Sequence, residues 1–454
     1  MPPRAIPASF WRGGTSRGLL FRAETLAAYP RAVRDRIILT ALGSPDPAGR
    51  QISGLDGGVS SLSKAAIVSV PGEGKDLQDA CGKLPGVSWA DDGERDGVGK
   101  WDLVYRFAQV GVKKPELDWT ASCGNMFAAA ALQAVSVPLV PYTTLFTRSR
   151  TLPQSDDYKP IMFPLSILSA SNGVLMRARV PLDPITLHPW EPAPGEGVGI
   201  AGVPGKEESG IEVEMPLEVT GGIARSGLVT GRPTDTVKLE NGREITVSLL
   251  TSGLPNIFVP LSSLLALDPS LPPNLLTLSS HQLTSIPHLS SLLETIRTST
   301  AAQHNLPCSL ATPKIVLVGE VPSEGYTTSS GDRVGRENAD LLVRAVSSGD
   351  WHATIPGTTL GALNVGMGTP GTVVRSLCAP TPKPSPAPAN ITAGAGQEEE
   401  RVVTIRAAHA AGVAESSVRF EAGGKPQSVV MVRTAREIMR GEVLVPERVF
   451  WEGQ

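Results

Sequence analysis

Two helix-like segments without a charged residue constrain this chain more than any other feature. They are Gly124–Val135 (GNMFAAAALQAV) and Thr358–Gly368 (TTLGALNVGMG). The first is rich in alanine, which favours a helix, and the second consists mainly of small residues. A helix that has no charged face has to be buried on all sides. Because strand-like runs flank both segments, we predict an α+β protein with two similar halves, each with a buried helix surrounded by strands.

Other segments have the residue pattern of an individual strand or helix. Strands are predicted at 65–70, 102–110, 174–180, 211–219, 244–250 and 315–318. A short helix is predicted to end at Leu42 and another to lie near Leu289–Arg297, and Glu337–Ser347 has apolar residues at helical spacing. We expect an inserted surface loop at 72–100 and a disordered, Pro-rich excursion at 379–398.

The length of the chain also favours more than one domain. It has 454 residues, of which 41% are hydrophobic and 19% are charged, so that a sizeable core is expected. The 47 glycines and 40 prolines favour many turns and short strands over long helices. We predict an N-terminal lobe at 1–205 and a C-terminal lobe at 206–454, with the last strand allowed to cross back to the first lobe.

Several classes of protein find no support in the sequence. The net charge of −3 gives no basic footprint for nucleic acid or for an acidic membrane. Neither an apolar run of about 20 residues nor a secretory signal is present. The four cysteines (Cys81, Cys123, Cys308 and Cys378) form no CxxC pair. Walker A, GxGxxG and HExxH motifs are missing. We therefore expect a cytoplasmic protein with no metal, no nucleotide cofactor, no nucleic-acid partner and no membrane partner.

The starts of the two buried helices are candidate sites for binding acids. Cys123 lies just before the first helix, where the helix dipole and unpaired N–H groups favour the thiolate form. The N–H groups of Gly124 and Asn125 can hold a substrate carboxylate. The alternative is a small buried hydrophobe at a helix start. Thr358 and Thr359 can bind an acid in the same way at the second helix, or simply cap it.

Lys64 is the second candidate for chemistry. It directly precedes an apolar strand, and a lysine that points into a core is costly unless it has a function. Desolvation would let it act as a base, and if it stayed charged it would stabilise an enolate-like oxyanion. Ser60 and Ser61 follow a Gly-Gly pair and offer hydroxyl donors for an anion. The alternative is a surface lysine beside a strand.

A third candidate is the Gly-rich segment Arg12–Gly18 (RGGTSRG). Its two arginines, Arg12 and Arg17, can receive carboxylates through two hydrogen bonds each, and Thr15 and Ser16 add hydroxyl groups. The alternative is a tight turn between two strands.

Taken together, these motifs and several later ones resemble the PrpF family. That family contains 2-methylaconitate isomerases and relatives that act on methylitaconate, oxalomesaconate and aconitate. The matching segments follow the family's order along nearly the whole chain: Arg12–Gly18, Gly43–Asp46, Gln51–Lys64, Cys123–Asn125, Pro313–Val318, Ala339-Asp340 with Arg344, Pro370–Val373 and Arg433–Pro446.

The resemblance implies a fold and a reaction. The fold would be the diaminopimelate-epimerase type, in which each of two lobes wraps a sheet around a central helix. Lys64 and Cys123 match the family's proposed acid/base residues. The enzyme would be a cofactor-independent isomerase that moves a proton and a C=C bond in an aconitate-like tricarboxylate. The expected partner is a small di- or tricarboxylate substrate, with a homodimer as one option for assembly.

Two departures from the family keep alternatives open. Relatives often have a cysteine in the second central helix, where Asn364 stands here, and the segment His409–Gly412 keeps only half of their histidine-proline-serine-glycine turn. An epimerase or racemase of a small acid on the same fold is one alternative, and the missing second cysteine speaks against it. A non-catalytic carboxylate-binding protein is the other, and the presence of Lys64 and Cys123 speaks against that.

Overall fold

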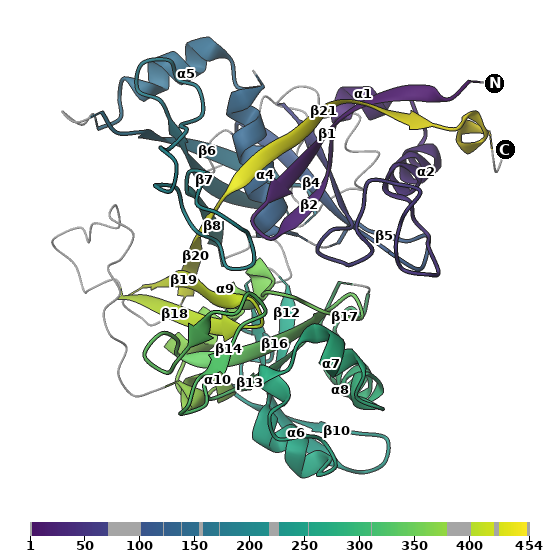
Figure 1. Cartoon of the computed structure of the whole chain (residues 1–454), viewed down its shortest axis with the longest axis vertical. Coiled ribbons are helices and arrows are strands. Elements are labelled where there is room, and N and C mark those ends of the chain that lie inside the picture. Colours follow the sequence, from purple (N-terminus) through teal and green to yellow (C-terminus); the bar gives the residue numbers. More distant parts are fainter. Residues whose placement is uncertain are drawn as a thin grey trace. The chain divides into compact units, whose positions relative to one another are not determined.

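The chain forms two compact units (Figure 1). The computed structural model describes residues 2–70, 101–120, 122–137, 139–153, 158–171, 173–217, 227–252, 254–309, 311–378, 401–421 and 426–451. The expected surface loop at 72–100 and the expected disordered excursion at 379–398 lie outside these ranges. Unit 1 comprises residues 1–214 and 432–454, and unit 2 comprises residues 215–431.

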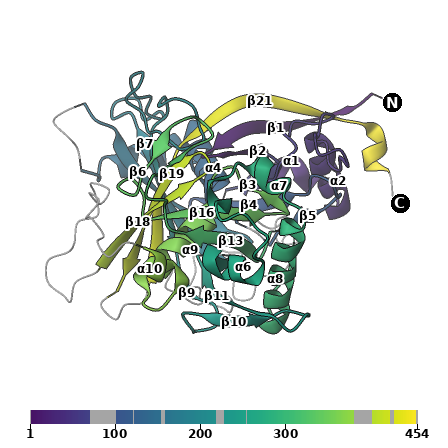
Figure 2. The same ribbon diagram turned by 60° about the horizontal axis from the view of Figure 1, so that its bottom comes forward.

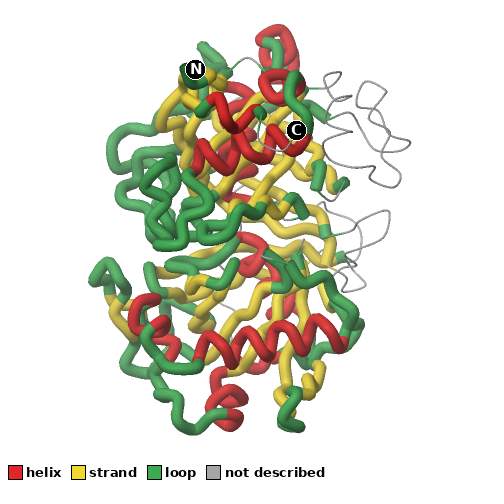
Figure 3. The backbone as a smooth tube through the Cα atoms, turned by 90° about the vertical axis from the view of Figure 1, so that its right-hand side faces the viewer, coloured by secondary structure: helices red, strands yellow, loops and turns green. Residues whose placement is uncertain are grey.

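Strands make up most of the regular structure in both units (Figure 3). In unit 1 they are β1 (Arg4–Gly13), β2 (Ser16–Arg22), β3 (Lys64–Ser69), β4 (Leu103–Val110), β5 (Leu117–Asp118), β6 (Ile161–Ser169), β7 (Val174–Leu182), β8 (Ile211–Pro216) and β21 (Ala435–Val445). In unit 2 they are β9 (Gly227–Leu228), β10 (Asp235–Lys238), β11 (Glu244–Thr251), β12 (Pro255–Pro260), β13 (Lys314–Gly319), β14 (Tyr326–Thr327), β15 (Arg333–Val334), β16 (Leu341–Ser347), β17 (Asp350–Trp351), β18 (Arg401–His409), β19 (Gly412–Phe420) and β20 (Pro426–Arg433). Both β8 and β20 run across a boundary between the units.

The helices are fewer and mostly short. In unit 1 they are α1 (Ala23–Ala27), α2 (Arg31–Leu42), α4 (Gly124–Ser136) and α5 (Tyr142–Ser149). In unit 2 they are α6 (Leu261–Leu267), α7 (Ser280–Thr284), α8 (Leu289–Gln303), α9 (Gly357–Gly368) and α10 (Val373–Leu377). No helix in the described ranges is both long enough and apolar enough to cross a membrane.

The two units repeat one strand topology. In unit 1, β1 pairs antiparallel with β2, β2 parallel with β3, β3 antiparallel with β4, β4 parallel with β6, and β6 antiparallel with β7. In unit 2 the same sequence of pairings joins β11, β12, β13, β16, β18 and β19. In unit 1, helix α4 lies in the connection between the parallel strands β4 and β6. In unit 2, helix α9 lies in the connection between the parallel strands β16 and β18. The predicted duplication is therefore present at the level of topology.

The two uncharged segments form the central helices. In unit 1, α4 packs against β1, β2, β4, β7 and β21, and β1 and β21 run side by side (Figure 1). In unit 2, α9 packs against β9, β11, β18 and β19 (Figure 2). Every residue of α9 is buried, and in α4 only Leu132 and Ser136 are not. Because strands surround both helices, neither has a face that requires polar residues.

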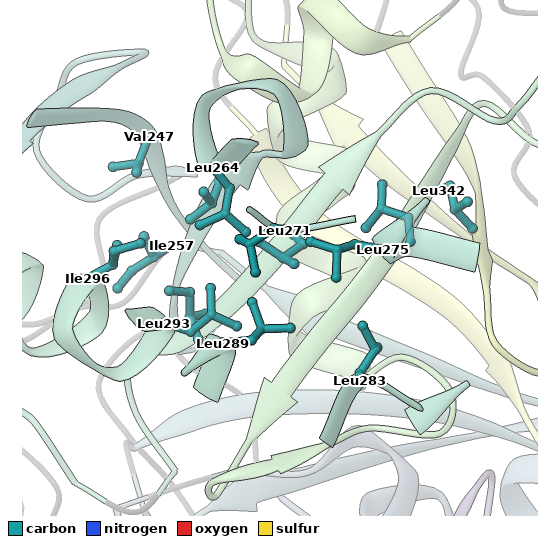
Figure 4. Packing of buried hydrophobic residues seen from close by; sticks show 14 of the residues in the cluster. Val247, Ile257, Leu264, Leu271, Leu275, Leu283, Leu289, Leu293, Ile296 and Leu342 are labelled. Carbon is teal, nitrogen blue, oxygen red and sulfur yellow. The ribbon is translucent and has the colours of Figure 1, made fainter. Parts of the chain in front are cut away.

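Unit 2 has a second apolar core on the other side of its sheet. Leucine and isoleucine side chains from α6, α7 and α8 pack against β11, β12 and β16 (Figure 4). Leu275, Leu289 and Ile296 are fully buried there. This core packs helices against strand β11, which also contacts α9.

One expectation about an element needs correction. Glu337–Ser347 has apolar residues at helical spacing, but residues 341–347 form strand β16, because short apolar runs that are buried on both faces fit either period. The first segment of unit 1 runs to residue 214, and residues 212–214 pair with β7 of that unit. The last strand, β21, belongs to unit 1, where it pairs with β1.

Candidate active site

The site begins at the N-terminus of α4. Cys123 is the residue before the helix, and its backbone is extended (φ −139°, ψ 106°). Its carbonyl accepts the first helical hydrogen bond from the N–H of Phe127 at 2.9 Å. The thiol is free and partly exposed, and it makes no capping hydrogen bond. The N–H groups of the first helical turn therefore have no cap from this side chain.

The Gly-rich turn between β1 and β2 lies against this helix start. A Cβ atom on Gly13 would lie 2.0 Å from the carbonyl oxygen of Asn125, and one on Gly14 would lie 2.4 Å from its Oδ1. Gly14 also has a φ of +48°, which favours glycine. The Asn125 side chain donates to the hydroxyls of Thr15 and Ser16, both at 3.2 Å. The turn is thereby fixed to the first turn of α4.

Lys64 is the first residue of β3, and its side chain is buried, with 7% of the residue exposed. Its Nζ donates to Oε1 of Gln109 at 2.5 Å and lies 5.3 Å from the centre of the Phe107 ring. Burial lowers the pKa of Lys64 below its usual 10.5, while Cys123 and Asp56 act in the opposite direction. Cys123 is therefore close enough to influence the charge of Lys64.

One face of strand β4 supports both residues. Tyr105, Phe107 and Gln109 alternate along the strand and so point to the same side. The Tyr105 hydroxyl donates to the Cys123 carbonyl at 3.2 Å, and burial raises the pKa of Tyr105 well above 10. Sequence reasoning missed all three. The signal available in the sequence was the spacing of two residues, which places all three side chains on one face of the strand. Lys64 shares that face, because it is paired with Gln109 across β3 and β4.

Gln109 has its orientation fixed by the loop before β3. Its Nε2 donates to the carbonyls of Ser60 at 3.0 Å and Ser63 at 2.9 Å. The amide oxygen is therefore the atom that faces Lys64. Ser61 likewise contributes its carbonyl, which accepts from the backbone N–H of Arg17 at 3.2 Å. Ser60 and Ser61, the two serines expected to offer hydroxyl donors, thus contribute main-chain oxygens to these contacts.

Asp56 lies in the same loop and is buried. Its Oδ2 accepts from Nε2 of Gln51 at 3.2 Å, and the same amide donates to Ser63 at 2.9 Å. Its Oδ1 is buried and makes no hydrogen bond within the described residues. Burial raises the pKa of Asp56 from 3.8 to about 8, against the effects of its hydrogen bonds and of Arg17 and Lys64. This carboxyl is therefore mostly protonated at neutral pH.

The arginines near the turn differ in their partners. Arg12 forms an ion pair with Glu208 at 2.8 Å and donates to Oγ1 of Thr434 at 3.0 Å. Arg17 lies 5.7 Å from the centre of the Phe10 ring and acts on the charge of Asp56. Arg433, which the sequence reasoning treated only as part of a motif, is buried and interacts electrostatically with Cys123.

The two threonines expected at the second central helix lie in unit 2, where polar neighbours engage them. The Thr359 hydroxyl donates to Oδ1 of Asn256 at 2.7 Å, and the Thr358 carbonyl accepts from Ser252 at 2.7 Å. Asn364, at the position of the family's second cysteine, donates to Ser416 at 2.6 Å. These groups therefore hold α9 within its own unit.

The structure thus gathers most of the predicted site residues in unit 1. Around the start of α4 it brings together Cys123, Gly124, Asn125, Thr15, Ser16 and Lys64. No group of three His, Cys, Asp or Glu side chains suited to a metal ion is found in the described ranges. The arrangement offers a thiol, an amine and helix N–H groups, which suit the binding of an acid and the transfer of a proton.

Comparison with known proteins places the chain in a family. The sequence matches the PrpF protein family over residues 4–79 and 95–446. It is 27% identical to a 2-methyl-aconitate isomerase of Shewanella oneidensis, with 98% of each chain covered. It is 26% identical to a 3-methylitaconate isomerase of Eubacterium barkeri, with 97% of each covered. These relatives support the expected class of enzyme.

The fold has a counterpart among solved structures. The crystal structure of a methylitaconate-delta-isomerase aligns with a TM-score of 0.62 and 24% identity, covering 99% of this chain and 98% of that one. The prediction of an α+β, diaminopimelate-epimerase-like fold is confirmed. The matches in sequence and fold agree, and the chain is an isomerase that belongs to the PrpF family.

Proposed function

We propose that this isomerase moves a proton, and with it a C=C bond, in an aconitate-like tricarboxylate without a cofactor. One observation carries the proposal: the amine of Lys64 is buried, bonded to a neutral amide, and electrostatically coupled to the thiol of Cys123 at a helix N-terminus. The relatives named for 2-methyl-aconitate and 3-methylitaconate support this class of substrate.

Lys64 is the proposed proton acceptor. A lysine is a base only when its amine is neutral, and burial favours the neutral form of Lys64. Gln109 accepts a hydrogen bond from Nζ without adding a negative charge that would hold the proton on it. The neutral amine takes the proton from the substrate carbon allylic to the double bond. The electron pair left behind forms a new C=C bond, and the charge passes to a carboxylate as a dienolate.

Cys123 is the proposed proton donor. Its S–H gives a proton to the carbon at the other end of the dienolate, and the thiolate that remains is reprotonated from the Lys64 ammonium. Reprotonation at the new carbon gives a positional isomer. Rotation about a loosened bond before the proton returns gives a cis–trans isomer. The buried hydroxyl of Tyr105 stays protonated and fixes the Cys123 carbonyl.

Proton NMR in deuterated water tests the function. We would incubate the protein with cis-aconitate, trans-aconitate, itaconate and a methylated aconitate, and we expect new vinyl or methylene signals or deuterium uptake for one of them. Lys64→Met should abolish both exchange and isomerisation, whereas Cys123→Ala should keep exchange at the first carbon but lose product. Each loss should be about 10²–10⁴-fold.

The same assay separates the alternatives. Near-wild-type turnover by Cys123→Ala would contradict the assigned donor. Loss of optical activity of a pure hydroxy or amino acid would indicate a racemase. Tight binding of tricarboxylates without deuterium exchange would indicate a binding protein. Circular dichroism of each variant controls for loss of folding.

A further inference from the structure

Arg433 is a buried cation that forms no ion pair with an acidic side chain of the described residues. It is the last residue of β20, and only 7% of it is exposed. Its hydrogen bond within the described chain runs from one terminal nitrogen to the carbonyl of Val432 at 2.7 Å. A guanidinium has five N–H donors, and a buried cation is expected to be paired. The donors that this bond leaves over suit an anion that binds from outside the chain.

The surroundings of Arg433 place that anion beside Cys123. A Cβ atom on Gly14 would lie 3.2 Å from Cδ of Arg433. The Arg433 side chain therefore runs along the turn that is fixed to the N-terminus of α4. Burial lowers the pKa of Arg433 to about 10, so that the guanidinium stays charged at neutral pH, and the interaction with Cys123 opposes this shift. Uncapped N–H groups of a 13-residue helix and a buried guanidinium thus meet at one partly exposed thiol.

The two arginines of the Gly-rich turn have other surroundings. The guanidinium of Arg12 is paired with the carboxylate of Glu208. The guanidinium of Arg17 lies near the Phe10 ring and near Asp56, whose carboxyl is mostly protonated at neutral pH. A substrate carboxylate at Arg12 would have to displace Glu208. At Arg433 it would meet a cation that has no competing carboxylate in the described chain.

We propose that Arg433, together with the first turn of α4, forms an anion subsite that holds a carboxylate next to the thiol of Cys123. Taking that carboxylate to be part of the substrate rests on the proposed function. A guanidinium binds a carboxylate through two parallel N–H···O bonds, which would fix the orientation of the adjacent carbon. Neutral esters and amides of the same shape should bind poorly.

Alkylation of Cys123 tests the subsite without any assumption about the reaction. Iodoacetate and iodoacetamide differ by one negative charge, so that the ratio of their rates at the peptide containing Cys123 reports an anion subsite. Mass spectrometry separates this peptide from the one with the exposed Cys308. We expect Arg433→Met to lower the ratio of iodoacetate to iodoacetamide rates about 10-fold or more, as loss of a charge-assisted contact implies.

Two further variants serve as controls. Arg433→Lys keeps the charge and should keep most of the preference for iodoacetate. Arg177→Met removes the same charge from β7, where the side chain is 63% exposed, and should leave the ratio unchanged. An unchanged ratio in a folded Arg433→Met protein would overturn the subsite, even if the wild type isomerised its acid. If no tested acid were isomerised but the ratio fell as expected, the proposed reaction would fail and the subsite would stand.

Discussion

Replacing Asp56 by asparagine tests the electrostatics of the loop before β3. Only 7% of Asp56 is exposed, its Oδ1 makes no hydrogen bond within the described residues, and burial raises the pKa of its carboxyl from 3.8 to about 8 in the folded protein. Asparagine has nearly the same shape as the protonated acid and cannot ionise. The amide oxygen of the asparagine should therefore still accept the hydrogen bond from Gln51. The variant should not pay the free-energy cost of ionising a buried carboxyl.

The magnitude follows from linkage between proton binding and folding. The folded pKa is higher than the unfolded one, so that the contribution of Asp56 to stability is complete below pH 3.8 and is lost as the pH rises to about 8. Each pH unit in this window costs the wild type about 1.4 kcal/mol. Over roughly four units the total reaches about 6 kcal/mol at most. The difference in unfolding free energy, variant minus wild type, should rise with this slope and level off above pH 8.

Urea unfolding of both proteins, followed by circular dichroism from pH 5 to 9, measures this difference. Subtracting the two curves removes the contributions of those titrating groups that do not interact with Asp56. Glu442→Gln, which removes an exposed carboxylate from β21, controls for the change in net charge. A difference curve that stays flat between pH 5 and 8 would refute the reasoning, because Asp56 would then ionise equally in the folded and unfolded chain.

Three other substitutions address the site and the core. Gln109→Glu places a carboxylate against Lys64, so that the pKa of Lys64 should rise, and the rise in kcat/KM with pH should move to higher pH; an unmoved profile would exclude Lys64 as the base. Gly14→Ala forces a Cβ into Asn125 at a positive φ and should cost about 1–3 kcal/mol in urea unfolding, whereas a neutral effect would mean that the turn is not held as described. Leu293→Ala should cost about 2–5 kcal/mol and leave the Cys123 alkylation ratio unchanged, since it opens a cavity in the core of unit 2. A changed ratio would show that this core does influence the site.

Much of the fold could be predicted from local patterns. The uncharged segments form α4 and α9, and the short strands at 65–70 and 102–110 form β3 and β4 with small shifts at their ends. These predictions were right because a segment that is buried on all sides lacks charged residues, and this lack can be read directly from the sequence. Residues 341–347 were harder, because six of the seven are buried and such a run fits a helix as well as a strand, so that only pairing with β13 and β18 makes it a strand.

The chemistry of the site was only partly visible in the sequence. Cys123 and Lys64 stand next to predicted elements, so that their candidacy followed from position alone. The sequence could not show that Glu208, nearly 200 residues away, pairs with Arg12, or that Arg433 has no such partner among the residues that the structure describes. Charge pairing depends on distance in space, and composition says nothing about it.

Local sequence thus determined which segments are buried, where the central helices begin, and which residues at their starts can carry protons. Tertiary structure alone decided that β4 supplies Tyr105, Phe107 and Gln109 to one face, because the register of β3 against β4 sets which side chains meet Lys64. It also decided which arginine is neutralised and which is left for an anion. The physical reason is that helix burial is a property of a continuous segment, whereas the pairing of charges depends on side chains that only the folded sheet brings together.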